Sequence, residues 1–194
     1  MVKAIKVMLI PNNVQQTKLF QYAGALRFAY NWALAREKES YEKGGKFISD
    51  SELRKEFTKL RHSDEYAWLL NISNNVTKQA IKDVCTAYKN FFRGLQKFPR
   101  FKSKKNPVKS YTTNSVNGNI LLKDGKLKLP KAGWIRIRQH RKIREDACLK
   151  GASVCLEADG RYYVSLLYFC EEKPVETRNI RQVVGLDFSM KELY

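Results

Sequence analysis

Residues 73–96, SNNVTKQAIKDVCTAYKNFFRGLQ, decide how the chain is organised. At about 100° per residue, apolar side chains from Val76 to Leu95 fill one half of the helical wheel. A narrow stripe on the other side is cationic and has one acid, Asp83, nearby. The stripe consists of Lys78, Lys82, Lys89, Arg93 and Lys97. The pattern predicts an amphipathic helix over 73–96 that packs on a core and leaves its basic side free for solvent or a phosphate backbone.

The residues before this helix predict one strand followed by two more helices. Val2–Ile10 alternates between apolar and polar residues, which is typical of a half-buried strand. Over 14–43, apolar residues recur every three or four positions and predict a long helix. A shorter helix is expected over 50–60, with Asp50 or Ser51 as its N-cap.

After residue 109 the apolar period changes to two. Asp124-Gly125 is a two-residue hairpin signal, and the final apolar run, Val183–Phe188, predicts a buried strand that carries Asp187. The other predicted strands are 111–115, 120–123, 126–129, 134–138, 153–157 and 162–169. The sequence therefore predicts an α+β fold, a small β-barrel or sheet with a helical insert after its first strand.

The charge of the chain is high and uneven. The 194 residues contain 37 Lys+Arg and 19 Asp+Glu, a formal net charge of +18. Residues 98–150 alone carry a net +12, whereas residues 151–194 carry −2. Nucleic acid is the partner that best offsets such a charge, and an anionic membrane surface is the second choice. No apolar run approaches 18 residues, so no membrane span is expected.

Four scattered cysteines form no C-x-x-C pair. They predict reduced thiols in a cytoplasmic protein and no zinc site.

The segment 98–109, FPRFKSKKNPVK, has five cations, two aromatic residues and no acid. A solvated basic loop is one interpretation. Nucleic acid is favoured, because rings can stack on bases while cations hold phosphates. We expect binding to be mainly electrostatic, through residues 89–109 and 131–144.

Eight phrases in a fixed order resemble the N-terminal half of the TnpB (OrfB) family, the accessory transposases of bacterial insertion sequences. They are a Pro-terminated first strand, Arg27–Leu34 (RFAYNWAL), Ala87–Arg93 (AYKNFFR), Phe98–Lys105 (FPRFKSKK), Ser110-Tyr111, Lys126–Lys131 (KLKLPK) with Gly133-Trp134, Tyr162–Ser165 (YYVS) and Val184–Asp187 (VGLD). Members of this family are RNA-guided DNA endonucleases related to type V CRISPR effectors.

The resemblance implies three units and two nucleic-acid partners. A wedge-like β-barrel would comprise 1–11 and 110–180, a helical recognition insert 12–109, and a RuvC-like nuclease domain would begin near 183. The insert and barrel would bind a guide RNA and read a short motif in double-stranded DNA beside the target. By resemblance the motif-reading positions are Asn74, Asn75, Lys78 and Asn117. Further nucleic-acid contacts are predicted at Lys82, Lys89, Arg93, Arg100, Lys102, Lys104, Lys105, Arg136, Arg138 and Arg141.

Asp187 matches the family's first catalytic acid and would be a magnesium ligand. The family's second acid, its zinc-ribbon cysteines and its last acid would all lie beyond residue 194. One carboxylate cannot place the magnesium ions that phosphodiester cleavage needs. We therefore expect this chain to bind nucleic acid without cutting it, to hold neither magnesium tightly nor zinc, and to be a truncated protein.

Three alternatives remain open. The chain could be a fragment of an active nuclease whose other acids come from missing residues or a second chain. It could be a structural RNA-binding protein of ribosomal type, although the nuclease-like strand has no role there. It could be a DNA-binding regulator, although its first helices are too long and aromatic for a compact helix-turn-helix.

Overall fold

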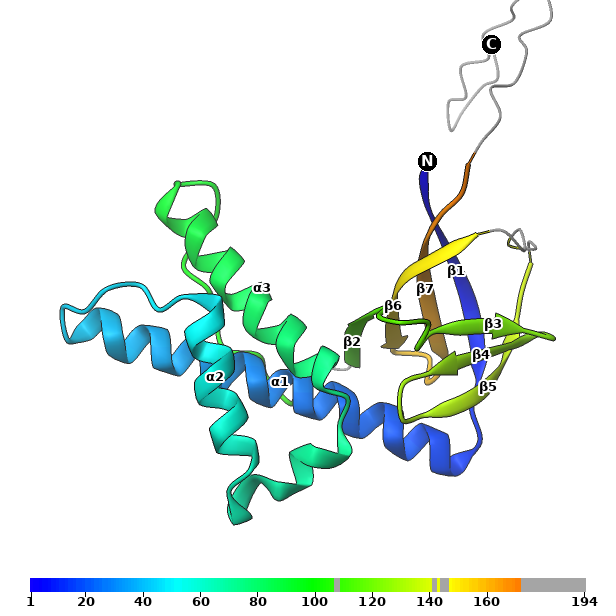
Figure 1. Ribbon diagram of the computed structural model, residues 1–194, viewed down its shortest axis with the longest axis horizontal. Coiled ribbons are helices and arrows are strands. Elements are labelled where there is room, and N and C mark those ends of the chain that lie inside the picture. The colour runs from blue at the N-terminus through cyan, green and yellow to red at the C-terminus, as the bar shows by residue number, and fades with distance from the viewer. Residues whose placement is uncertain (107–108, 141–142, 144–146, 172–194) are drawn as a thin grey trace, which may run out of the picture.

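The computed structural model describes residues 1–106, 109–140, 143 and 147–171 (Figure 1). Helices lie on one side of the molecule and a curled antiparallel sheet lies on the other. The helix α1 (Asn13–Glu42) runs from beneath the sheet to the far end of the helical side. The α+β class predicted from the change of period is confirmed.

The first two helices begin at capping boxes. The Asn12 side chain accepts from the Gln15 N–H at 2.9 Å, and the Gln15 side chain accepts from the Asn12 N–H at 3.1 Å, so α1 starts where the first strand ends. The helix α2 (Asp50–Arg61) is capped in the same way by Ser49 and Glu52. The prediction of Asp50 or Ser51 as the cap of α2 is wrong, because Glu52 completes a reciprocal pair only with Ser49.

The helix α3 (Asn74–Phe92) buries the apolar face that its period predicts, from Val76 to Tyr88. It ends four residues earlier than predicted, because Gly94 adopts a φ of +71° and turns the chain out of the helix. Phe92 and Leu95 consequently lie outside the core, with exposed fractions of 54% and 70%. The 3₁₀-helix η1 (Asp64–Asn71), which joins α2 to α3, was not predicted.

Seven strands form one antiparallel sheet that curls into a half-barrel (Figure 1). They are β1 (Val2–Ile10), β2 (Lys109–Asn114), β3 (Leu121–Lys123), β4 (Lys126–Leu129), β5 (Gly133–Arg138), β6 (Cys148–Leu156) and β7 (Tyr162–Phe169). Their order across the sheet is β2-β6-β7-β1-β5-β4-β3. A strand was predicted at each of these seven places, with bounds correct to within two residues except at the start of β6. The strand β6 starts five residues early because a register shift between Leu149 and Gly151 hides its alternation.

The first strand lies in the middle of the sheet between two strands that are distant in sequence. On one side Ile5 pairs with Leu166 of β7, and on the other Leu9 pairs with Ile137 of β5. The sheet meets the first half of α1, where the Tyr22 ring lies 5.4 Å from the Tyr111 ring of β2 and the Tyr162 hydroxyl of β7 donates to the Gln16 carbonyl at 3.4 Å. One hydrophobic core therefore continues from the sheet into the helical layer.

No helix of the described residues is both long enough and apolar enough to cross a membrane. The predicted strand Val183–Phe188 lies outside the described residues.

Candidate nucleic-acid interface

The basic stripe on α3 points away from the core. Lys78, Lys82 and Lys89 are exposed, and Arg93 at the end of the helix is exposed as well. The neighbouring acid Asp83 accepts a hydrogen bond from the Gln79 amide at 2.8 Å. Like charges four residues apart, such as Lys78 and Lys82, destabilise a helix, and an anionic partner would remove that repulsion.

The start of α3 lies beside the loop that follows β2. The Asn114 amide donates to the Gln79 side chain at 3.0 Å, which joins the end of β2 to the second turn of α3. Three residues further along, Asn117 is exposed at a turn with a φ of +51°. The structure thus brings the loop of Asn117 towards the first turns of α3, where Asn74 and Lys78 are exposed and Asn75 is partly exposed.

The basic loop is fastened to α1 by one amide side chain. Asn31 accepts from the Lys102 backbone N–H at 2.8 Å and donates to the Lys102 carbonyl at 3.0 Å. This pair of bonds fixes the loop at its centre. The cationic residues on either side, Arg100, Lys104 and Lys105, stay exposed.

The ammonium of Lys102 has a different environment from its neighbours. It lies 4.2 Å from the centre of the Tyr30 ring, although the residue as a whole retains exposed surface. Burial there lowers the pKa of Lys102, and the charge of Asp83 opposes that effect. Lys102 therefore helps Asn31 to hold the loop, while the other cations of the loop face outwards.

A second basic surface covers the outer face of the sheet. In β5, Ile135 faces the core, whereas Trp134, Arg136 and Arg138 are exposed, as the alternation of the strand predicts. Pairing of neighbouring strands extends this surface. Arg136 is opposite Lys126 of β4, and Lys126 is opposite Lys123 of β3.

These three cations form a row across the strands, and Lys128 lies in the next row opposite Trp134, with its ammonium 6.0 Å from the ring centre. Like charges directly opposite one another destabilise a sheet. Two unit charges about 5 Å apart repel by about 0.8 kcal/mol in water. A polyanion laid across the row would reverse the sign of this contribution.

Lys123, Lys126 and Lys128 were not among the predicted contacts. Their signal is the alternation of Lys and Leu in β4, which places Lys126 and Lys128 on the face opposite the buried Leu127 and Leu129, and Lys123 joins that face by pairing with Lys126. The alignment of Lys123, Lys126 and Arg136 depends on how β3, β4 and β5 pair. The sequence of a single strand does not reveal that pairing register.

Two predicted site residues, Arg141 and Asp187, lie outside the described residues. Within the described part of the chain, no three His, Cys, Asp or Glu side chains come together in a way that could hold a metal ion. The described residues therefore do not fit a magnesium site.

The sequence of this chain is similar to those of several known proteins. A family model described as a helix-turn-helix domain, that of OrfB proteins, matches residues 1–46. An Escherichia coli protein provisionally named RNA-guided DNA endonuclease InsQ is 32% identical over 193 residues, which are 98% of this chain and 46% of that protein. A Streptomyces pristinaespiralis protein with the provisional name RNA-guided DNA endonuclease is 29% identical over 194 residues, 98% of this chain and 47% of that protein.

The chain belongs to the OrfB (TnpB) family. It spans about half the length of these two relatives. The virulence protein VsdF of Salmonella dublin is 31% identical over 113 residues, which are 54% of this OrfB chain and 95% of VsdF.

The structure qualifies the description of the matched OrfB domain. Residues 1–46 form the strand β1 and the single helix α1, which is unbroken over 30 residues. A helix-turn-helix has two helices joined by a short turn, and the second long helix of this chain, α2, begins only at Asp50.

Proposed function

We propose that this chain is the nucleic-acid-binding half of an RNA-guided DNA endonuclease, and that it binds a guide RNA and target-adjacent double-stranded DNA. The observation that carries the proposal is the cationic row of Lys123, Lys126 and Arg136, where three like charges are aligned on one exposed face. The relatives named as RNA-guided DNA endonucleases support the choice of partners.

Each surface has a separate role in this proposal. Rows of cations with a neighbouring ring, Trp134, suit the phosphates and unstacked bases of a folded RNA. The exposed amides Asn74 and Asn117, with the partly exposed Asn75, suit base edges in a groove, because an amide can both donate and accept. Lys78 would hold the adjacent phosphate.

We further propose that residues 1–194 bind without cleaving. Asp187 would be one ligand of the family's magnesium ions, and the remaining acids would come from residues beyond 194 or from a second chain. Phosphodiester cleavage with two metal ions needs several carboxylates to place both ions.

The first test is the salt dependence of RNA binding, measured by fluorescence anisotropy between about 50 and 200 mM salt. Lys123, Lys126 and Lys128 are replaced together by Ala. The matched control removes Lys38, Lys55 and Lys59, three exposed lysines of α1 and α2, and so lowers the net charge equally.

We expect a steep slope of log affinity against log salt for the parent chain. The β3–β4 variant should reduce that slope by about 0.7 for each phosphate that it no longer neutralises. A flat slope for the parent chain, or an equal effect of the control, would overturn the proposal.

The second test sequences the RNA that co-purifies with the chain and adds magnesium with target DNA. Bound RNA without cleavage is the expected result. Cleavage that Asp187→Ala abolishes would show that a second copy completes the site and that the chain is not merely a binding half.

A further inference from the structure

Six aromatic rings meet at the end of the helical layer that is far from the sheet. We call them the aromatic tip: Tyr41, Phe47, Tyr88, Phe91, Phe92 and Phe98. They come from the end of α1, the loop between α1 and α2, the end of α3 and the loop after it. Neighbouring ring centres are between 5.3 and 6.5 Å apart, so the six rings form one connected surface.

The tip has a buried base and an exposed rim. Tyr88 is 1% exposed and anchors the cluster in the core. Tyr41 and Phe92 are 62% and 54% exposed, and Phe47 and Phe98 also reach the surface. An exposed cluster of this size on a folded chain indicates an interaction site, because large contiguous apolar surfaces are rare without a partner.

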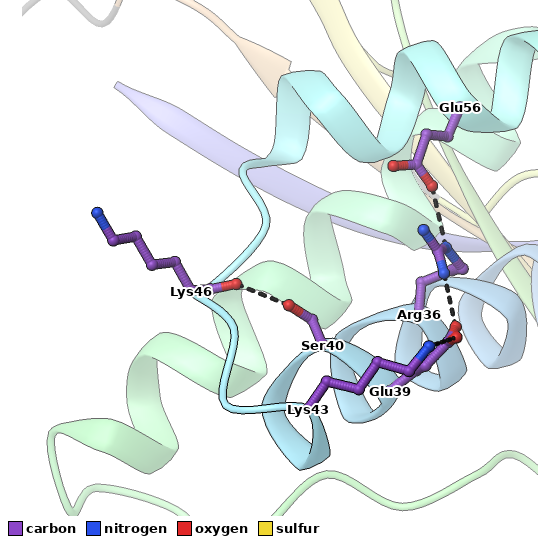
Figure 2. Close-up of polar contacts among 6 residues, drawn as sticks. All are labelled: Arg36, Glu39, Ser40, Lys43, Lys46 and Glu56. Atoms are coloured by element: carbon purple, nitrogen blue, oxygen red, sulfur yellow. Dashed lines mark hydrogen bonds and ion pairs between the residues drawn. The ribbon is translucent and has the colours of Figure 1, made fainter.

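Polar contacts hold the rim in place. Figure 2 shows Arg36 of α1 bonded to Glu56 of α2 at 3.0 Å and to Glu39 at 2.6 Å. The Ser40 hydroxyl donates to the Lys46 carbonyl at 2.9 Å and so fixes the loop that presents Phe47. The Lys46 side chain points away from the other residues drawn. The rim is therefore a preorganised surface, which lowers the entropy cost of binding.

The charge around the tip selects its partner. On the side of the tip formed by α3 and the loop after it, the sequence from residue 84 to residue 123 contains nine lysines and arginines and no acid, whereas the α1 side carries the buried Glu37 and the exposed Glu42. Arg93 and Lys97 follow Phe92 closely, Arg100 follows Phe98 within two residues, and all three cations are exposed. Lys43, at the end of α1, is paired with Glu39 at 2.6 Å. Flat exposed rings beside exposed cations are the combination that binds single-stranded nucleic acid, with rings under the bases and cations at the phosphates.

We propose that the aromatic tip binds unpaired nucleotides by stacking, with Phe92 and Tyr41 under the bases and Arg93 at the phosphates. This inference deepens the proposed function and rests on it. A duplex hides the faces of its bases between neighbouring pairs, so the rings have nothing to stack on except at an end. A second copy of this chain is disfavoured as the occupant, because both copies would bring the same cations together.

The test compares a labelled single-stranded oligothymidylate of 12 nucleotides with a 12-base-pair duplex, by anisotropy, using the full 194-residue chain. The variants are Phe92→Leu, which keeps an apolar side chain and removes the ring, and Tyr41→Ala. The control is Phe20→Ala, which removes a similarly exposed ring, 47% against 54% for Phe92, from the sheet-proximal part of α1. Circular dichroism confirms that each variant is folded.

We expect Phe92→Leu and Tyr41→Ala each to weaken binding of the single strand by at least about fivefold, since stacking on one ring supports about that much affinity. The slope against salt and the affinity for the duplex should not change, because every cation that meets a phosphate is still present. Arg93→Ala should instead reduce the slope by about 0.7. An oligonucleotide with 4-thiothymidine should crosslink to residues 41, 47, 92 or 98.

Two failures are distinguishable. If the parent chain binds neither oligonucleotide, the proposed function fails together with this inference. If it binds both and the ring variants leave the single strand unaffected, only the inference is overturned, and the tip is then a surface for a protein partner.

Discussion

Replacing Asn31 by Ala tests whether the basic loop has to be held in place to bind. The side-chain amide of Asn31 makes both of its hydrogen bonds to the backbone of Lys102, at 2.8 and 3.0 Å, across 71 residues of sequence. Hydrogen bonds of this kind contribute about 0.5–1.5 kcal/mol each, and partial exposure puts these two at the lower end. The substitution therefore removes about 1–2 kcal/mol that orders the loop.

That free energy sets the size of the expected effect. Because about 1.4 kcal/mol corresponds to a factor of ten, protection of the Lys102 amide from hydrogen exchange should fall about 5- to 30-fold. RNA affinity should fall by no more than the same factor, because Arg100, Lys104 and Lys105 are still present and only their arrangement changes. The slope of affinity against salt should stay the same.

Hydrogen exchange with mass spectrometry and anisotropy measure the two quantities on the same samples. The matched control is Asn13→Ala, which removes an exposed amide from the first turn of α1. Unchanged exchange at Lys102 would refute the role of Asn31 as the fastening. Faster exchange with unchanged affinity would refute the idea that the fixed loop takes part in binding.

Three further substitutions test the helical layer. Gly45→Ala should lower the free energy of unfolding by about 1–3 kcal/mol, as overpacking usually does, because a Cβ there would lie 2.7 Å from the Ser40 hydroxyl and 2.9 Å from the Ser40 carbonyl. Gly24→Ala should raise it by about 0.5–1 kcal/mol in urea denaturation, since a helical Cβ there meets open space; a loss of stability would contradict this. Burial raises the pKa of Glu37 above its ordinary 4.5, and the smaller effect of the Ile48 N–H opposes it. The folded state thus disfavours the charged form, so Glu37→Gln should become more stable relative to the parent as pH rises from 4.5 through the raised pKa. An equal difference at pH 4 and pH 8 would show that Glu37 is not the group responsible.

Local patterns predicted the fold where each element has a regular period of its own. The strand Val2–Ile10 and the helix that follows it are examples, because alternation and 3.6-residue spacing are both visible within ten residues. The early part of β6 was missed because a register shift between Leu149 and Gly151 breaks the alternation. The 3₁₀-helix η1 was missed because eight residues are too few to show a helical period.

The candidate interface was predictable only in part for a similar reason. The outward position of Arg136 follows from its own strand. Its alignment with Lys126 and Lys123 depends on how three strands pair, and the meeting of Tyr41 with Phe92 depends on how α1 packs on α3. Packing between distant segments also explains why Asn31, in the middle of a helix, controls a loop 71 residues later.

The central place of β1 in the sheet has a consequence for synthesis of the protein. Both partners of β1 are made late, because Ile5 pairs with Leu166 and Leu9 with Ile137. At about 5–20 residues per second, a ribosome needs roughly 8–30 s to make the intervening 160 or so residues. Until β5 has been made, about 128 residues after its partner in β1, both edges of β1 are unpaired, while α1, α2 and α3 can already pack on one another. The helical layer should therefore form first during translation, and the sheet should close around a strand that emerged before any other.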